Sequence, residues 1–315
     1  MKLLITRPLP SRVVEAARSR FDVTLRESTA PLSGPELRAA LRDHDAVLPT
    51  LGDLFRAEVF AEVPRPRARI LANFGVGTNH IDVAAARAAG LAVTNTPGAV
   101  TDATADIALT LILMTARRAG EGERLVRAGL WQGWHPTQML GMHVSGKRLG
   151  VIGMGRIGRA IARRAHLGFG MEVTFFNRSP VADPGVPARQ VGFAEALSAD
   201  VVVLAVPATP ETRHLIDAAA LARMRPQAIL VNIARGDVVD ETALIEALRT
   251  GRLAGAGLDV YEFEPRVPEA LRAMETVTLL PHLGTAALEV RESMGLMALD
   301  NLAAFAEGRP LPNPV

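Results

Sequence analysis

The chain has 315 residues and a formal net charge of +2, and 22% of its residues are charged. A chain of this length usually exceeds what one hydrophobic core serves, so we expect two domains. It has no cysteine, which excludes disulfide bonds, thiolate metal sites and cysteine nucleophiles. Scattered arginines with only 4% aromatic residues argue against a nucleic-acid-binding surface.

Targeting and membrane segments are not predicted. The N-terminal segment MKLLITRPLPSRVV has an apolar run too short for a signal peptide and no small-residue cleavage site. No stretch reaches the roughly 18 uninterrupted apolar residues that a membrane span needs. We therefore expect a cytoplasmic protein that binds neither membranes nor nucleic acids.

Short runs rich in Val, Ile and Leu alternate with longer segments of helical period. The runs lie at 3–6, 23–25, 46–49, 70–74, 92–95, 149–153, 173–177, 201–206, 229–233, 257–260 and 277–280. Apolar runs of this kind are typical of strands buried on both faces of a parallel sheet, and their alternation with helices predicts an α/β fold. A long helix over 102–128 separates the first five runs from the later ones, and a last helix covers 286–307, so we expect two sheets.

The segment Leu149–Gly158 has the pattern of a dinucleotide-binding loop. Gly153 would allow a tight turn after a strand, Gly155 would let a pyrophosphate approach the backbone, and Gly158 would let the next helix pack closely on the strand. We expect that helix to span 159–167, with the pyrophosphate at the amides of 154–157, which include Met154, Arg156 and Ile157.

The end of the following strand predicts which cofactor binds. NAD-binding loops usually place an acidic residue about 20 positions after the glycines, where it binds the ribose 2′-hydroxyl. Here Asn177, Arg178 and Ser179 stand in that region, and the next carboxylate is Asp183. These donors suit a 2′-phosphate, so NADPH is favoured over NADH. Alternatively, the segment is simply a solvated turn.

Three residues that follow later apolar runs are candidates for catalysis. Ligands of open α/β sheets bind beyond the carboxyl ends of the strands, and Arg235, Glu264 and His282 each follow a different run. A cation, a carboxylate and an imidazole are what reduction of a carbonyl beside a carboxylate requires. Two of them also have a structural alternative: His282 as a packing residue, and Arg235 as a helix cap or the partner of Asp237.

The remaining histidines carry less information. His80 lies in a glycine-containing turn that could approach a ligand. The others are expected at the surface: His44, His135, His143, His166 and His214. Their spacing matches no metal-ligand pattern, so no metal site is predicted.

Several separated motifs resemble the D-isomer-specific 2-hydroxyacid dehydrogenases. They lie, in the family's order, at 73–82, 96–106, 149–158, 207–212, 232–236, 259–265 and 281–282. The resemblance implies two doubly wound parallel-sheet domains. A Rossmann cofactor domain would cover 100–286, a flavodoxin-like substrate domain would combine 1–99 with 287–315, and the protein would be a homodimer.

The resemblance also implies roles for individual residues. Arg235 would bind the substrate, and Glu264 would orient His282, the proton donor, and stabilise its charged form. The amides of Val76 and Gly77 would hold the substrate carboxylate. Further cofactor contacts are implied for Thr104, Val206, Pro207, Thr212, Ile233, Ala234, Asp259 and Gly284.

Within the family, the chain is most similar to the glyoxylate/hydroxypyruvate reductases, which reduce a small 2-oxo acid to its D-2-hydroxy acid with NAD(P)H. Trp134 matches a tryptophan that reaches the partner subunit's substrate pocket in some of them, although an anchor in the core or at the surface is an equal alternative. Ala205 departs from the histidine that many members carry there, which puts one adenine-side contact in doubt.

Three other functions share this scaffold. A reductase of 2-ketogluconate or another sugar acid would have the same motifs, because substrate choice depends on the shape of the pocket. A dinucleotide-sensing corepressor would not need Arg235, Glu264 and His282 together. An oxidase of phosphonate or formate would carry pocket residues or extensions that are absent from this sequence.

Overall fold

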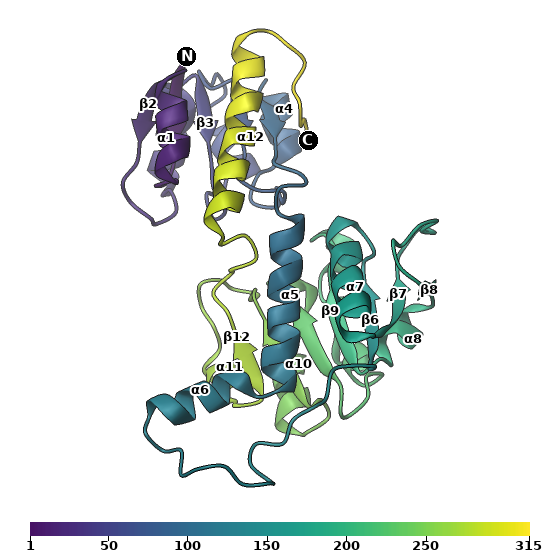
Figure 1. Cartoon of the computed structure of the whole chain (residues 1–315). Helices are drawn as coiled ribbons and strands as arrows, with labels where there is room; N and C mark the ends of the chain where they lie inside the picture. Colours follow the sequence, from purple (N-terminus) through teal and green to yellow (C-terminus); the bar gives the residue numbers. More distant parts are fainter. The chain divides into compact units, whose positions relative to one another are not determined.

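The computed structural model describes residues 1–315, which form two compact units. The first unit comprises residues 1–100 and 285–315, and the second comprises residues 101–284. Figure 1 shows the chain entering the second unit at α5 and returning to the first at α12. No helix combines the length and the apolar character needed to cross a membrane.

The first unit contains an all-parallel sheet with the strand order β2-β1-β3-β4-β5, the order of a flavodoxin-like fold. Its strands are β1 (Lys2–Ile5), β2 (Asp22–Leu25), β3 (Ala46–Leu48), β4 (Ile70–Ala72) and β5 (Ala92–Thr94). Its helices are α1 (Ser11–Arg18), α2 (Gly34–Asp43), α3 (Ala57–Ala61), α4 (Val83–Ala88) and α12 (Leu288–Ala306).

Helices pack on this sheet through apolar faces. Buried residues of α2, α3 and α4 form one core cluster with β3 and β4, while α12 packs against α1 and β4. The chain's C-terminal residues lie along β5, where the Val315 amide donates to the Val93 carbonyl over 3.0 Å. The end of the chain therefore covers an edge of the sheet that would otherwise expose backbone groups.

The second unit contains a seven-stranded parallel sheet with the order β12-β11-β10-β9-β6-β7-β8, a Rossmann arrangement extended by one strand. Its strands are β6 (Arg148–Ile152), β7 (Glu172–Phe176), β8 (Ala188–Gln190), β9 (Val201–Leu204), β10 (Ile229–Asn232), β11 (Gly255–Leu258) and β12 (Val277–Leu279). Its helices are α5 (Thr101–Ala116), α6 (Ala119–Arg127), α7 (Arg156–Phe169), α8 (Phe193–Leu197), α9 (Ala218–Leu221), α10 (Glu241–Arg249) and α11 (Glu269–Ala273), with short 3-10 turns at Pro210–Thr212 and Gly236–Val238.

The strands of this sheet are apolar on both faces because both are covered. Val201 and Val203 of β9 join a core cluster with α5 and α7, whereas Val202 and Leu204 join a second cluster with α8, α9 and α10. Alternate side chains of one strand thus enter different cores. This double burial explains why the sequence shows continuous apolar runs, and it confirms the predicted α/β fold with two parallel sheets.

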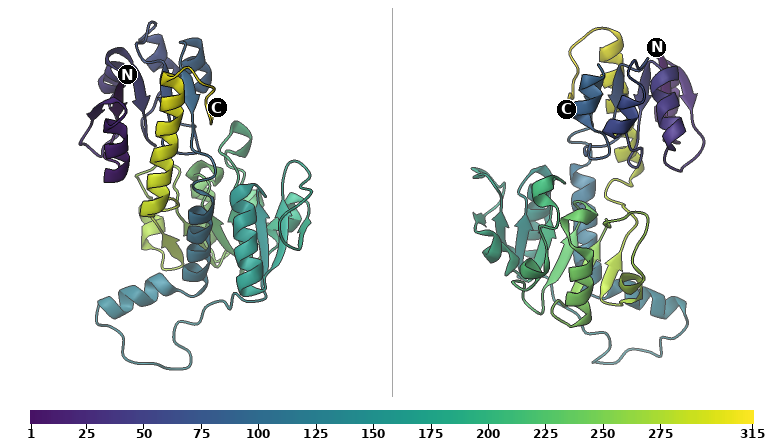
Figure 2. Two further views of the ribbon diagram at one scale, coloured as in Figure 1. Left: turned by 45° about the horizontal axis from the view of Figure 1, so that its top comes forward. Right: turned by 180° about the vertical axis from the view of Figure 1, so that it is seen from behind.

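The predicted long helix over 102–128 is wrong, because it is two helices. Helix α5 ends at Ala116, Arg118 has a left-handed backbone with φ of 52°, and α6 starts at Ala119. The segment at 141–142 crosses the end of α5, where the Met142 amide donates to the Ala116 carbonyl over 2.7 Å. Helix α6 and the loop after it extend away from the rest of the second unit, as both views of Figure 2 show.

Candidate active site

The glycine loop lies between β6 and α7. Gly153 has φ of 100°, and a Cβ there would lie 2.7 Å from the Ala205 carbonyl oxygen, so both the turn and its neighbour require glycine. Gly155 is the N-cap of α7, and no side chain caps this end of the helix. The helix starts at Arg156, three residues earlier than predicted, which places the third glycine in its first turn.

The loop is closely packed on one side and open on the other. A Cβ at Gly158 would lie 2.1 Å from the Gly153 carbonyl oxygen, so the helix could not approach the loop with any other residue there. A Cβ at Gly155 would meet nothing within 4 Å. The start of this 14-residue helix thus has no side-chain cap and has open space beside Gly155, which fits a pyrophosphate group.

The turn after β7 has no carboxylate at its start. Asn177 accepts from the Met154 amide at 3.2 Å and donates to the Ser179 carbonyl at 2.9 Å. Its side chain therefore connects the glycine loop to the turn after β7. Gln190 of β8 also donates to the Ser179 carbonyl, at 3.1 Å. Arg178 and Ser179 are exposed. Of the three predicted donors, these two side chains are therefore the ones directed to solvent.

The catalytic candidates follow three neighbouring strands of the sheet. Arg235 follows β10, Glu264 follows β11 and His282 follows β12. Because parallel strands end at the same edge, this order brings the three side chains to one edge of the second unit. The sequence predicted each residue separately, and the topology explains why they converge.

His282 and Glu264 form a hydrogen-bonded pair. Nδ1 of His282 lies 2.9 Å from Oε2 of Glu264, and the two side chains are 29% and 31% exposed. Since a carboxylate only accepts, Nδ1 carries the hydrogen and Nε2 is the atom that can serve a substrate. Burial acts to raise the pKa of Glu264, but the hydrogen bond and charge of His282, with the Tyr261 amide, outweigh it and hold that pKa below its ordinary value.

Asp259 holds the loop on which His282 lies. Its side chain is buried and accepts from the amides of Leu283 at 2.6 Å and Gly284 at 2.8 Å. The His282 amide donates to the Asp259 carbonyl at 2.9 Å, and Thr104 donates to the Gly284 carbonyl at 3.1 Å. Burial raises the pKa of Asp259. One hydrogen-bonded cluster next to His282 therefore contains three predicted cofactor contacts, Thr104, Asp259 and Gly284.

Arg235 lies in a crowded turn. It donates to the Ala234 carbonyl at 2.7 Å, and a Cβ at the neighbouring Gly236 would lie 1.8 Å from the Tyr261 carbonyl carbon. The turn therefore packs directly on the backbone of the loop that leads to Glu264. Burial lowers the pKa of Arg235, while the charges of Glu264 and Asp237 act to raise it; a guanidinium stays protonated in either case.

The other predicted cofactor residues lie at the ends of β9 and β10. Val206 and Pro207 follow β9, and the Thr212 hydroxyl donates to the Pro207 carbonyl at 2.7 Å, which closes that loop. Ile233 and Ala234 follow β10 and are buried. These positions lie along the same edge of the sheet as the glycine loop and the strand-end residues.

In the first unit, the loop that contains Val76 and Gly77 is held through its carbonyl groups. The buried side chain of Asn73 donates to the carbonyls of Gly75 and Gly77, both at 3.0 Å, and Asn95 donates to that of Val76 at 2.9 Å. His80 is also buried, and its Nε2 lies 3.0 Å from Oδ1 of Asn73. Sequence reasoning missed the two asparagines as functional residues, although Asn73 begins the first family motif.

Two predictions about exposure can be settled. Trp134 is 80% exposed, which excludes its alternative as an anchor in the core. The prediction that His44 lies at the surface is wrong, because its side chain is buried. Burial also lowers the pKa of His44. A polar sequence context did not reveal that the residue after α2 is buried. No group of three or more His, Asp or Glu side chains is arranged to hold a metal ion.

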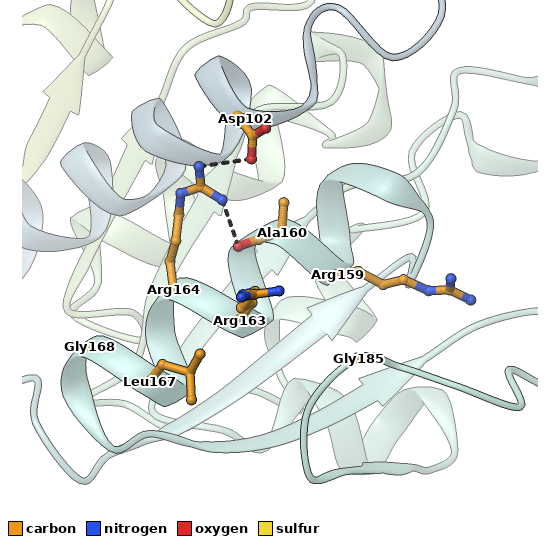
Figure 3. Close-up of a pocket in the computed structure, with 8 residues that line it drawn as sticks. All are labelled: Asp102, Arg159, Ala160, Arg163, Arg164, Leu167, Gly168 and Gly185. Carbon is orange, nitrogen blue, oxygen red and sulfur yellow. Dashed lines mark hydrogen bonds and ion pairs between the residues drawn. The ribbon is translucent and has the colours of Figure 1, made fainter.

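A hollow on the outer side of α7 is a separate feature (Figure 3). Arg159, Arg163 and Arg164 line it, together with Asp102 at the start of α5. Arg164 donates to Asp102 at 2.9 Å and to the Ala160 carbonyl at 3.2 Å. None of the residues that line it is a strand-end residue or a glycine-loop residue, so it does not belong to the candidate active site.

Comparisons with known proteins identify relatives over the whole length. Residues 109–284 match the family model described as D-isomer specific 2-hydroxyacid dehydrogenase, NAD binding domain. A glyoxylate reductase from Thermococcus onnurineus is 44% identical, covering 100% of this chain and 95% of that protein.

Solved structures of similar proteins share the fold of this chain over its whole length. A crystal structure of a protein from Thermus thermophilus is 43% identical with a TM-score of 0.93, covering 100% of both chains. An NADPH-dependent glyoxylate/hydroxypyruvate reductase from Sinorhizobium meliloti, in complex with NADP and malonate, is 34% identical with a TM-score of 0.88, covering 100% of this chain and 96% of that one. The chain belongs to the D-isomer-specific 2-hydroxyacid dehydrogenase family, and its second unit contains the NAD-binding domain of that family.

Proposed function

We propose that this enzyme reduces glyoxylate and hydroxypyruvate to their 2-hydroxy acids with NADPH in preference to NADH. The observation that carries the proposal is the His282–Glu264 pair at 2.9 Å, in the loops after β12 and β11, with Arg235 after β10, the strand next to β11. The names of the relatives support the substrate class, since one is a glyoxylate reductase and another a glyoxylate/hydroxypyruvate reductase.

The residues divide the chemistry between them. When bound, the nicotinamide cofactor would supply the hydride for C2 of the 2-oxo acid. Arg235 binds the acid and polarises its carbonyl group, and Nε2 of His282 donates the proton that the carbonyl oxygen takes up. Glu264 holds the imidazole through Nδ1 and balances its positive charge before transfer. The imidazole then regains its proton from solvent.

We further propose that the substrate carboxylate is held by the amides of Val76 and Gly77. Asn73 and Asn95 engage the three carbonyls of residues 75–77, which fixes the orientation of the peptide groups between them. Consecutive amides fixed in this way form a binding site for an anion. On this proposal, the first unit is the substrate domain and the second is the cofactor domain.

The preference for NADPH is proposed from the turn after β7. An acidic side chain that would bind a ribose 2′-hydroxyl is missing there, and the exposed Arg178 can bind a 2′-phosphate instead. The name of the Sinorhizobium meliloti relative, which is NADPH-dependent, supports the proposal.

We also propose that the enzyme is a homodimer. The loop after α6 exposes several large apolar side chains in a short stretch, and a second copy could cover them. They are Leu130, Trp131, Trp134 and Leu140. Light scattering coupled to gel filtration tests this: a monomeric mass at micromolar concentration would contradict it.

Steady-state kinetics test the function itself. Glyoxylate, hydroxypyruvate and 2-ketogluconate should each be tried with NADPH and with NADH. We expect the highest kcat/KM for the two small acids with NADPH. A clear preference for the sugar acid would assign a different substrate to the same chemistry, and no turnover with any 2-oxo acid would refute the proposed function.

A further inference from the structure

The loop after β11 contains a second acidic residue, Glu262, whose side chain pairs with His214 and Arg213. Its side chain is only 8% exposed, and Oε1 is shared by Nε2 of His214 at 2.8 Å and Nη2 of Arg213 at 3.1 Å. A buried carboxylate is tolerated when it is paired in this way, and it then fixes the backbone that carries it. Glu262 precedes Glu264 by two residues, so it holds the same short loop.

The backbone of Glu262 is held as well. Its amide donates to Oε1 of Glu241 at 2.9 Å, and Glu241 is a buried residue in the first turn of α10. Burial raises the pKa of Glu241, and the charges of Glu262 and Glu264 add to this effect. Beside this contact, the Tyr261 hydroxyl donates to the Leu280 carbonyl at 2.9 Å. The loop is thus attached to α10 and to the end of β12.

His214 connects this loop to the turn that follows β10. It has a left-handed backbone with φ of 48°, and its amide donates to the Asp237 carbonyl at 2.7 Å. Asp237 lies in the turn that follows β10, two residues after Arg235. His214 therefore holds this turn with its backbone and Glu262 with its imidazole. The strained backbone is consistent with a position that both contacts impose together.

We propose that Glu262, held by His214, is a positioning residue for catalysis: it fixes the loop so that Glu264 meets Nδ1 of His282 in the orientation that proton donation needs. This role requires no contact of Glu262 or His214 with substrate or cofactor. This inference rests on the proposed function, because it assigns a further role within the same reaction. It predicts that loss of the Glu262 contacts weakens catalysis only through Glu264.

A double-mutant cycle tests this coupling. We expect Glu262→Ala to lower kcat for reduction of the 2-oxo acid by about tenfold and by no more than Glu264→Gln does, since a displaced catalytic group loses at most what it contributes. The optimum pH for reduction should move in the same direction as in Glu264→Gln. In the Glu264→Gln background, Glu262→Ala should lower kcat by less than about twofold, because the negative charge that Glu262 positions is already lost.

Further variants separate positioning from general loss of structure. Glu262→Gln keeps a hydrogen-bond acceptor and should recover part of the activity. His214→Ala leaves Glu262 paired with Arg213, so it should fold even if Glu262→Ala does not, and its loss of kcat should also disappear in the Glu264→Gln background. Glu246→Ala is the matched control: it breaks an ion pair with Arg249 at 2.7 Å elsewhere on α10 and should leave kcat unchanged. Thermal unfolding should confirm that each variant is folded.

The outcomes are distinct. If wild-type enzyme reduces no 2-oxo acid, the proposed function is wrong. If wild-type enzyme is active but the losses from Glu262→Ala and Glu264→Gln multiply in full, Glu262 does not act through Glu264 and the inference is overturned. An unchanged pH profile in a folded, less active Glu262→Ala enzyme would overturn it as well.

Discussion

Replacing Glu264 with glutamine removes the negative charge beside the imidazole and keeps the size of the side chain. In the structure this carboxylate lies 2.9 Å from Nδ1 of His282, with both side chains about one-third exposed. The amide oxygen can still accept from Nδ1, so the imidazole keeps a partner. What is lost is the charge that stabilises the protonated imidazole, the form that donates to the substrate.

The expected loss of kcat in Glu264→Gln follows from the charged hydrogen bond between Glu264 and His282. A hydrogen bond to a charged group contributes about 1.5–3 kcal/mol, and partial exposure of this pair favours the lower half of that range. Since about 1.4 kcal/mol corresponds to a factor of ten in rate, kcat should fall by roughly 10- to 30-fold. The KM for NADPH should hardly change, because the glycine loop is untouched.

The charge of Glu264 also makes activity and stability depend on pH. The pKa of Glu264 is lowered by His282, so the carboxylate is charged throughout the neutral range. Reduction needs the protonated imidazole, and Glu264→Gln removes its anionic partner, so the pH profile for reduction should change. The pair's contribution to stability should be full above the usual pKa of about 4.3 for an unfolded glutamate and should be lost as the pH falls through the lowered folded value.

The assay is the initial rate of NADPH oxidation with glyoxylate across the pH range, for wild type and Glu264→Gln, with thermal unfolding measured in the same buffers. Equal kcat and superimposable pH profiles would show that the carboxylate does not support the imidazole. A difference in unfolding temperature that stays constant down to acidic pH would contradict the sign derived for the ion pair.

Three other variants have defined outcomes. Arg178→Glu should raise the KM for NADPH by about tenfold or more with little change for NADH, since a charge-assisted contact is lost; equal effects on both cofactors would reject a 2′-phosphate site. Asn95→Ala should raise the KM for glyoxylate about fivefold and change kcat less, because one carbonyl of the anion-binding loop loses its donor; an altered cofactor KM alone would contradict this. Gly158→Ala would place a Cβ 2.1 Å from a carbonyl oxygen of the loop. It should abolish NADPH binding in a fluorescence titration or destabilise the fold by about 1–3 kcal/mol. Unaltered binding and stability would show that the loop is not closely packed.

The layout of both sheets could be predicted because buried parallel strands leave a direct trace in the sequence. Every predicted apolar run overlaps a strand. The strand that escaped notice, β8, lies at an edge of the sheet and is largely exposed, so it has no apolar run. The break between α5 and α6 also escaped, because it falls at Arg118, whose left-handed backbone is not indicated by a glycine or proline at that position.

The candidate site could be predicted only in part, for a similar reason. Arg235, Glu264 and His282 are visible in the sequence because each follows a strand and carries a reactive group. The residues that hold the loops of the site are not: Glu262 and Asn95 bond to partners that are brought near only by the fold. Individual residues of a site can thus be read from the sequence, whereas the contacts that orient them require the structure.

Replacement of His282 is the most direct test of the proposed chemistry. With saturating glyoxylate and NADPH, His282→Asn should lower kcat by about 10²- to 10⁴-fold, the usual contribution of a general acid, while the enzyme stays folded and binds NADPH with unchanged affinity. A folded His282→Asn enzyme that turns over glyoxylate at the wild-type rate would show that the imidazole at the end of β12 does not donate the proton.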